Sequence, residues 1–479
     1  MVKELLNKLK ENNIHISLLG TELLLRFDGA GPDKKLIQEL KENKDQVIEY
    51  LKALNLNSHY TSIHPVVPAK DYPLSSSQRR LWTLCQFDAA NVAYNMPGAY
   101  IFSGKLDVAS LEKAVKEMFN RHEIFRTSFK ENENGEIRQF IRSVNEIDFD
   151  LTYEDLQAFP DQKERLQSIL IKETNTTFDL SVGNLLQVKL IRLQEEEFIF
   201  SYVIHHIISD GWSMELLMKE LMQLYIAFSN GLPSPLSPLT IQYKDYAVWQ
   251  QQQLVNSELK SHKQYWLDKF EYESPILELP YDFERPVFKK YDGEVTTGVF
   301  DKDLTEGLKK LAHLQGGTLF MCLLSGINAL FYRYTNQTDI TIGSPIAGRD
   351  KVELENQIGF YVNTLALRAE FDSDDSFVRL MDHIKTMTLE AYEHQFYPFD
   401  ELVGEVYKSG DVSRNPLFDV VVVLQNTELS SKDAAPLPHE LQISHFAEQK
   451  RTVSLFDLRF DFREIGEELF VHIEFNTQL

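Results

Sequence analysis

An aperiodic segment divides this sequence into a short N-terminal part and a much longer body. Residues 57–70 read NSHYTSIHPVVPAK, fit neither the helical nor the strand period, and include two prolines. Such a segment is typical of a connector between folding units. The chain has 479 residues, too many for one ordinary compact core, so two or three globular units are expected.

Residues 1–56 predict a small unit with the order helix, strand, strand, helix, helix. Apolar residues at helical spacing over residues 2–9 indicate the first helix. Residues 14–18 and 23–27 each alternate apolar with polar side chains around a Gly-Thr turn, which predicts a β-hairpin. Two more short amphipathic helices are expected within residues 36–51.

Residues 71–479 predict a mixed α/β or α+β body that is split into two lobes, at 71–248 and 249–479. Helical periodicity alternates with runs of β-forming residues along this part of the chain. We expect helices over residues 106–119 and 213–229, strands over 185–193 and 197–208, and later strands or loops over 332–349, 418–425 and 469–475.

The charge of the chain excludes two classes of partner. The sequence has 49 basic and 72 acidic residues, a formal net charge of -23, which repels nucleic acid and anionic membranes. Cys85 and Cys322 are the only cysteines, too few for a disulfide framework or a zinc site. With no apolar stretch near the roughly 18 residues of a membrane span, we expect a cytoplasmic protein.

The run His205-His206-Ile207-Ile208-Ser209-Asp210-Gly211 has the residues of an acyl-transfer centre. An apolar run leads into the histidine pair, and Trp212-Ser213 opens a helix. Because neighbouring strand residues point to opposite faces, one histidine is expected to face a cleft and the other to pack.

The histidines, Asp210 and Gly211 have expected roles in acyl transfer. An imidazole can take a proton from an attacking amine or orient it. Asp210 can pair with a cation, while Gly211 allows a sharp turn and brings backbone N–H groups to a reacting carbonyl. The alternatives are two buried histidines or half of a metal site, but no third histidine or cysteine lies nearby to complete a zinc set.

Six further motifs accompany this run, and together the seven resemble those of condensation domains of nonribosomal peptide synthetases. The histidine run with Trp212-Ser213 looks like the family's core motif. The others are residues 74–82 (LSSSQRRLW, with Ser77 where alanine is usual), 121–129 (RHEIFRTSF), 243–249 (YKDYAVW), 358–364 (IGFYVNT, with Tyr361 where phenylalanine is common), 397–403 (YPFDELV) and 414–419 (RNPLFD).

The resemblance implies a pseudodimer of two chloramphenicol-acetyltransferase-like lobes with the active site in a tunnel between them. Donor and acceptor carrier proteins approach from opposite faces, each presenting a phosphopantetheine thioester, and the chain itself binds no cofactor and no metal. By this resemblance His206 contacts the acceptor amine, as a general base or as a positioning group, and His205 packs.

The resemblance also assigns supporting roles around the histidines. Asp210 is expected to form a structural ion pair with Arg349, the alternative being an arginine at the surface. Gly211 supplies the turn and a donor to the oxyanion. Asn363 could hydrogen-bond substrate or pantetheine, and a structural asparagine is the alternative.

Other positions within the motifs are expected to support the tunnel or the fold. Ser213 and Trp212 belong to this group, and the tryptophans Trp82, Trp212 and Trp249 are expected in the core. Arg79 and Arg80 are expected to be solvated helix charges.

The motif details favour a condensing enzyme of the L,L type. The first motif ends in RLWTL rather than in the ending typical of domains that take a D-configured donor. An epimerisation domain is the alternative, but the RHEIFRT and YPFD motifs suit condensation better. Heterocyclising relatives carry D-x-x-x-x-D where this chain has its histidine run.

Residues 1–56 resemble the N-terminal docking domains that receive an intermediate from a separate upstream subunit. An exposed hairpin edge can accept the C-terminal peptide of that subunit by strand addition, and basic side chains could pair with its acidic residues. The alternative is an N-terminal cap on the body. The expected docking residues are Ile16, Leu18, Leu23, Leu25, Arg26 and Lys34.

Two other functions compete with condensation between carrier-bound thioesters. The body could be a catalytically silent module that gathers carrier proteins, which the intact histidine run argues against. It could also be a free-standing acyltransferase that uses coenzyme A thioesters, which the docking-like N-terminus argues against.

Overall fold

The computed structural model describes residues 14–19, 22–27, 40, 44, 47, 62–146, 151–408, 410–425, 441–446 and 453–479. Two compact units divide the chain, Met1–Ile63 and His64–Leu479.

The first unit contains the predicted hairpin. Strands β1 (Ile14–Leu19) and β2 (Glu22–Phe27) are antiparallel, with Ile16 opposite Leu25 and Leu18 opposite Leu23. The hairpin prediction is therefore confirmed, whereas the predicted helices of this unit fall almost wholly outside the described residues.

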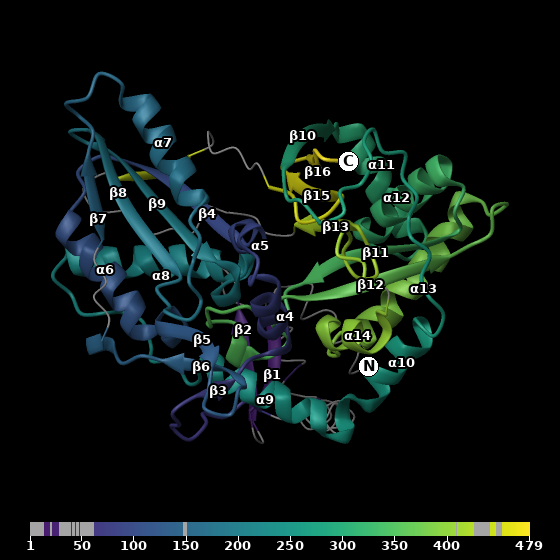
Figure 1. The fold of residues 1–479 in the computed structure, drawn as a ribbon, viewed down its shortest axis with the longest axis horizontal. Helices are drawn as coiled ribbons and strands as arrows, with labels where there is room; N and C mark the ends of the chain where they lie inside the picture. Colours follow the sequence, from purple (N-terminus) through teal and green to yellow (C-terminus); the bar gives the residue numbers. More distant parts are fainter. Residues whose placement is uncertain are drawn as a thin grey trace. The chain divides into compact units, whose positions relative to one another are not determined.

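The first half of the second unit is built on a five-stranded sheet with the order β14-β4-β9-β8-β7. Helix α7 covers one face, where Leu166 and Leu170 pack on Ala99 and Ile199, and α6 packs on α8 (Figure 1). The elements are β4 (Asn95–Ser103), α6 (Val108–Arg121), β7 (Thr152–Asp155), α7 (Gln162–Thr174), β8 (Leu186–Gln194), β9 (Glu197–His205), α8 (Gly211–Ser229) and β14 (Gln442–His445).

The same part of the chain also forms a separate three-stranded sheet and several helices. The sheet has the order β3-β6-β5, and α4 carries a capping box in which Ser75 and Gln78 bond each other's backbone. These elements are β3 (Tyr72–Pro73), α4 (Ser76–Leu84), α5 (Asp88–Ala93), β5 (Thr127–Glu131), β6 (Ile137–Ile141) and α9 (Tyr243–Val255).

The second half is built on a six-stranded mixed sheet with the order β10-β16-β15-β13-β11-β12. Its helices flank the sheet on the right of Figure 1. The elements are α10 (Lys260–Lys269), β10 (Gly293–Phe300), α11 (Lys302–Leu314), α12 (Leu319–Thr335), β11 (Asp339–Ile346), β12 (Asn363–Glu370), α13 (Phe377–Glu393), α14 (Phe399–Val406), β13 (Val420–Gln425), β15 (Leu458–Ile465) and β16 (Glu468–Asn476).

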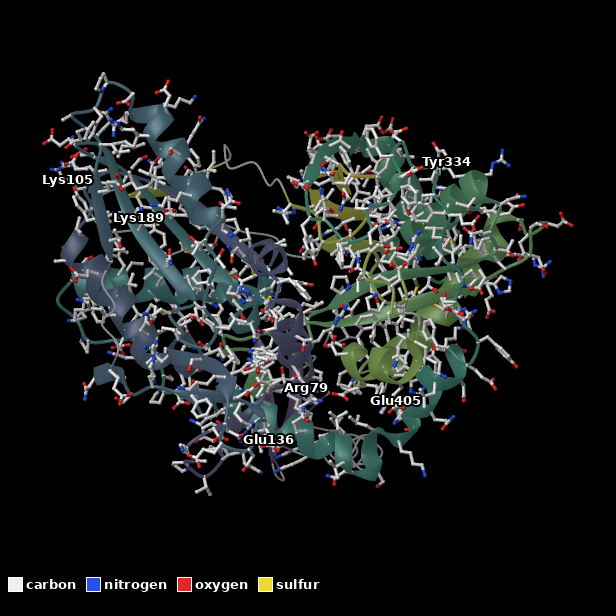
Figure 2. The ribbon with its side chains drawn as sticks, viewed as in Figure 1. Arg79, Lys105, Glu136, Lys189, Tyr334 and Glu405 are labelled. Carbon is white, nitrogen blue, oxygen red and sulfur yellow. The ribbon has the colours of Figure 1, made fainter. Side chains whose placement is uncertain are left out.

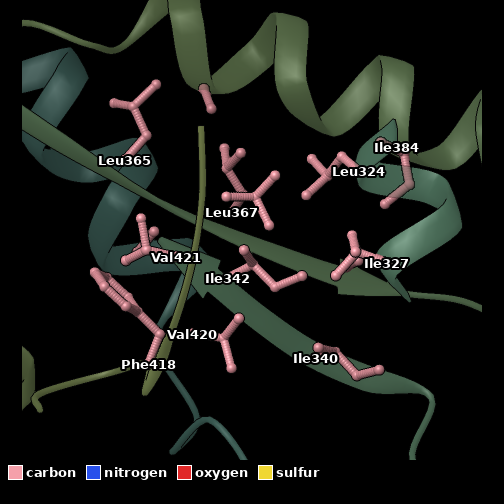
Figure 3. Packing of buried hydrophobic residues seen from close by; sticks show 14 of the residues in the cluster. Leu324, Ile327, Ile340, Ile342, Leu365, Leu367, Ile384, Phe418, Val420 and Val421 are labelled. Atoms are coloured by element: carbon pink, nitrogen blue, oxygen red, sulfur yellow. The ribbon is translucent and has the colours of Figure 1, made fainter. Parts of the chain in front are cut away.

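The core of this half forms where the sheet meets α12 and α13 (Figure 3). Ile340 and Ile342 on β11 alternate with Thr341, so both isoleucines reach the same face. They meet Leu324 of α12 and Ile384 of α13, which are fully buried. Truncating such a side chain to alanine would cost about 2–5 kcal/mol, so this core fixes the strands whose ends support the site.

The mixed α/β character was predicted, and the first unit ends within the segment 57–70 that was expected to connect two folding units. Strand β14 comes late in the sequence and yet pairs with β4 in the sheet of the first half. The expected lobe boundary between residues 248 and 249 falls inside α9. Among the described helices none alone is long and apolar enough to cross a membrane; α11 and α12 meet that test only jointly, across a bend of 102°.

Candidate functional site

Two side-chain caps shape the chain around the histidine pair. Strand β9 ends at His205, residues His206–Ile208 form a 3-10 turn, and α8 begins at Gly211. The Nδ1 atom of His205 accepts the Ile207 N–H at 3.2 Å. Asp210 is the N-cap of α8 and accepts the Ser213 N–H at 2.8 Å. Local hydrogen bonds thus end the strand and start the helix within six residues.

His205 belongs to the interior. Its side chain is completely buried, and its backbone N–H bonds the Leu185 carbonyl at 2.9 Å. Burial lowers the pKa of this imidazole to about 3. His205 is therefore neutral at physiological pH and suits the packing role expected of it.

His206 lies at the start of the 3-10 turn and is half-buried. Its backbone N–H bonds the Tyr94 carbonyl at 2.9 Å. The ring is held edge-on between Phe360, at 4.8 Å between centroids, and Tyr94, at 6.4 Å. We expected the alternation of side chains along a strand to give the two histidines different environments. The turn has this effect instead, because the strand ends at His205 and the turn begins at His206.

Asp210 and Arg349 meet as the resemblance to the family implied. The Arg349 Nη2 atom lies 3.1 Å from Asp210 Oδ1, and the two side chains are 1% and 0% exposed. The Tyr361 N–H donates to Asp210 Oδ2 at 3.0 Å, and Arg349 Nη1 donates to the carbonyls of Leu354 and Gln357, each at 2.6 Å. These additional bonds offset the cost of burying two charges, so a surface position for Arg349 is excluded.

The Ser213 hydroxyl extends this network. It accepts from Arg349 Nη2 at 2.7 Å and from the Gly359 N–H at 3.1 Å, and donates to the Gly359 carbonyl at 2.9 Å. Ser213 therefore joins the start of α8 to the loop before β12.

The amide of Asn363 is occupied by backbone partners. It donates to the carbonyls of Gln395 and Tyr397, at 2.9 and 3.1 Å, and accepts the Phe399 N–H at 2.9 Å. The structural alternative therefore describes Asn363 better than a bond to substrate.

Two expectations about Gly211 and Trp212 need correction. Trp212 is not a core residue, because its side chain is 44% exposed and its Nε1–H bonds the Glu355 carbonyl at 3.1 Å. Gly211 is the first residue of α8, and a Cβ there would meet no atom within 4 Å. It is not among the residues of positive φ, so no tight turn requires this glycine.

A pocket adjoins the histidine turn. Its wall includes Tyr94 and Phe360, the two rings that flank His206, although His206 itself is not part of the wall. The full lining is Ser77, Arg80, Leu81, Leu84, Tyr94, Phe360, Val362, Asn363, Thr364, Phe399 and Asp400. Three motifs that are far apart in the sequence thus converge on one space that both polar and apolar side chains line.

Arg80 was missed as a site residue. It pairs with Asp400 at 2.9 Å, lies over the Phe399 ring at 5.1 Å, and lines the pocket, so it is not a solvated helix charge. Arg79 fits that description better, since it is half exposed and bonds Gln251 at 2.9 Å. Figure 2 labels Arg79 on α4 and Glu405 on α14, the two helices that bring Arg80 and Asp400 together.

The chemistry of the turn fits acyl transfer without a covalent intermediate on the protein. The thiol closest to the turn, Cys85, lies 3.6 Å from His205 Nε2. Burial raises the pKa of this thiol to about 12, so it is protonated and a poor nucleophile. An imidazole beside a pocket can instead act directly on an incoming amine.

The expected docking residues are placed by their backbone alone. Ile16, Leu18, Leu23, Leu25 and Arg26 lie on the paired strands β1 and β2, and Lys34 lies outside the described residues. Their role in binding a partner stays a prediction.

Comparison with known families agrees with the motifs. The family model described as "Condensation domain" matches residues 68–479. A linear gramicidin synthase chain of Brevibacillus parabrevis is 38% identical over 471 residues, which is 97% of this chain and 9% of that protein. Gramicidin S synthase 2 of Brevibacillus brevis is 39% identical over 420 residues, 88% of this chain and 9% of that protein. The chain thus spans about a tenth of these relatives.

Solved structures share the fold. The X-domain from teicoplanin biosynthesis superposes with a TM-score of 0.79 at 24% identity, covering 88% of this chain and 92% of that one. The first condensation domain of the calcium-dependent antibiotic synthetase, in complex with a substrate analogue, gives 0.67 at 18% identity, covering 85% and 91%. At such low identity the likeness shows the fold alone, and that fold is the expected α/β one.

Proposed function

The chain belongs to the condensation-domain family of nonribosomal peptide synthetases, which are amide-bond-forming enzymes, and from this premise we propose how its site works. An acceptor aminoacyl thioester and a donor acyl or peptidyl thioester, each on the phosphopantetheine arm of a carrier protein, meet beside His206. The observation that carries this proposal is the position of His206 next to Tyr94 and Phe360, two rings that form part of the pocket wall.

The reaction needs one group that handles the proton of the amine. The amine lone pair attacks the carbonyl carbon of the donor thioester, the C–N bond forms, the C–S bond breaks, and the donor carrier leaves as a thiol. His206 orients the amine and accepts its proton, which the departing sulfur finally takes up. The first amides of α8 have no partner within the helix, and the Gly211 N–H is our candidate donor to the oxyanion.

The direct test measures the product on the acceptor carrier. Donor and acceptor carriers are loaded and mixed with the enzyme, and mass spectrometry detects the elongated thioester. We expect product with wild-type protein and none above background with His206→Ala, while a matched variant of the exposed His445, His445→Ala, stays active. Turnover with a coenzyme A thioester and a soluble amine, but not with carriers, would contradict the proposal.

The L,L specificity is part of the same proposal and needs its own measurement. It rests on the RLWTL ending of the first motif. Donor carriers loaded with L- and D-configured forms of one residue are compared at equal concentration. Faster condensation of the D-form would overturn the L,L assignment without affecting the amide-forming activity.

We further propose that residues 1–56 form a docking domain that recruits the upstream subunit in the cytoplasm. The described hairpin provides paired strands with two edges, and an edge can bind an extended peptide through main-chain hydrogen bonds. Two relatives matched over 97% of this chain are named as separate subunits of linear gramicidin synthase, and both alignments must extend into residues 1–56.

Deletion separates docking from catalysis. A chain of residues 64–479 keeps the second unit complete and should reach the wild-type rate at saturating donor subunit, but with a much higher KM for that subunit. An Arg26→Glu variant of the full chain should raise the same KM if acidic residues of the peptide bind there. Equal KM values for the full and shortened chains would refute docking.

A further inference from the structure

Helix α4 contacts the histidine turn on both sides of His206. The Gln78 Nε2–H donates to the Ile207 carbonyl at 3.1 Å, and Cys85, the C-cap of α4, places its Sγ 3.6 Å from His205 Nε2. Gln78, Cys85 and His205 are all buried. His206 therefore sits between two residues that are each tied to the same helix.

The hydrogen bonds of His205 determine where its proton lies. A neutral imidazole has one N–H donor and one acceptor nitrogen. The Nδ1 atom accepts the Ile207 N–H, so the proton must be on Nε2, which points at Cys85 Sγ. Burial keeps the pKa of the ring low and that of the thiol high, so the pair is a neutral N–H···S contact and not an imidazolium with a thiolate.

We propose that Cys85 is a positioning residue for amide-bond formation: its sulfur accepts the Nε2–H of His205 and so fixes the tautomer whose Nδ1 holds the turn that presents His206. The inference rests on the proposed function, because it takes His206 as the group that meets the amine.

Loss of the Cys85 acceptor should change the hydrogen bonds of His205. Without an acceptor, the Nε2–H of His205 would be buried and unsatisfied, which favours a rotated ring or the other tautomer. Either change breaks the bond from Ile207 N–H to Nδ1, on the residue next to His206. Gln78 still holds the Ile207 carbonyl, so the turn persists but the direction of the His206 ring is no longer fixed.

Two substitutions at Cys85 distinguish the loss of the hydrogen-bond acceptor from a change in side-chain volume. Cys85→Ser keeps a hydrogen-bond acceptor, whereas Cys85→Val fills similar space without one. Cys322, buried on α12 in the other half, gives the matched control Cys322→Ser. Each variant of the full chain is assayed with saturating loaded carriers, and the 15N shifts of labelled histidines report the tautomer of His205.

We expect Cys85→Val to lower kcat by roughly tenfold with little change in KM, as a misplaced catalytic group does. Cys85→Ser should stay within about threefold of wild type and keep the Nε2–H signature of His205, and Cys322→Ser should change neither. The proposal is overturned if Cys85→Val keeps both the rate and the signature, or if the serine and valine variants lose activity equally in step with their melting temperatures. Failure of the proposed function can be told apart from failure of the Cys85 proposal. If the proposed function is wrong, the His206→Ala variant remains active, whatever the 15N signal of His205 shows.

Discussion

Asp210 and Arg349 form a buried ion pair, 3.1 Å from Oδ1 to Nη2, although 139 positions separate them in the sequence. Asp210 caps α8 and also accepts the Tyr361 N–H. The pair therefore fixes the start of α8 against the loop that carries Phe360, the ring that flanks His206. Its role is structural, and it acts on the site by holding the start of α8 and the loop of Phe360 in place next to His206.

Asp210→Asn should destabilise the protein strongly. The asparagine keeps the shape but leaves the Arg349 cation buried without a counter-charge, a change that costs about 3–5 kcal/mol. Urea unfolding measures the loss. The double variant Asp210→Asn/Arg349→Met should lose less than the sum of the single variants, and Glu112→Gln in the exposed pair with Lys116, as a control, should cost less than about 0.5 kcal/mol. A stable, fully active Asp210→Asn would contradict this view.

Local periodicity predicted the elements that frame the site. The expected strand over residues 197–208 is present as β9, and it ends three residues early because the His205 side chain caps the turn. The expected helix over 213–229 is α8, which starts two residues earlier because Asp210 provides its N-cap. Side-chain caps shift such boundaries, and periodicity does not register them.

Contacts between distant motifs were predicted only where the family resemblance supplied them. Asp210 with Arg349 is one such contact. Gln78 and Cys85 reach the histidine turn across 129 and 120 positions, and neither spacing has a helical or strand period. From the sequence alone, Arg80 is indistinguishable from an ordinary charged residue on a helix surface. Its partner Asp400, on α14, is known only from the structure.

Substitution of the two histidines should separate catalysis from stability. His206→Ala should abolish condensation with an unchanged melting temperature, since the side chain is half-buried beside the pocket. His205→Ala should cost about 2–4 kcal/mol, because it removes a completely buried ring and its cap on the turn. Product assays and thermal unfolding of both variants check this, and a reversed pattern would show that the assignment of the two rings is wrong.

Stability should fall in mild acid through His205. Its folded pKa, about 3, is below the ordinary value of 6.5, so between these values the unfolded chain binds a proton that the folded chain excludes. The free energy of unfolding then decreases as pH falls, by about 1.4 kcal/mol per pH unit for this residue. The stability gap between wild type and His205→Gln should shrink by about 2 kcal/mol from pH 7 to 5.

Gly211 and Gly359 should respond to alanine in opposite ways. A Cβ at Gly359 would lie 2.0 Å from the Tyr243 ring, which cannot swing away because its hydroxyl donates to the Phe360 carbonyl at 2.7 Å and contacts Ser75. Gly359→Ala should therefore cost at least about 1–3 kcal/mol through overpacking.

A Cβ at Gly211 would meet open space at the start of α8, so Gly211→Ala should leave stability equal or raise it by about 0.5 kcal/mol. If reactants use the space beside the histidine turn, that methyl group should still lower kcat by at least about tenfold. Gly307→Ala on α11, where a Cβ also meets nothing, should stabilise without changing the rate. A Gly211→Ala enzyme that unfolds more easily than wild type would show that the glycine is needed by the backbone, and one with full activity would place the reactants elsewhere.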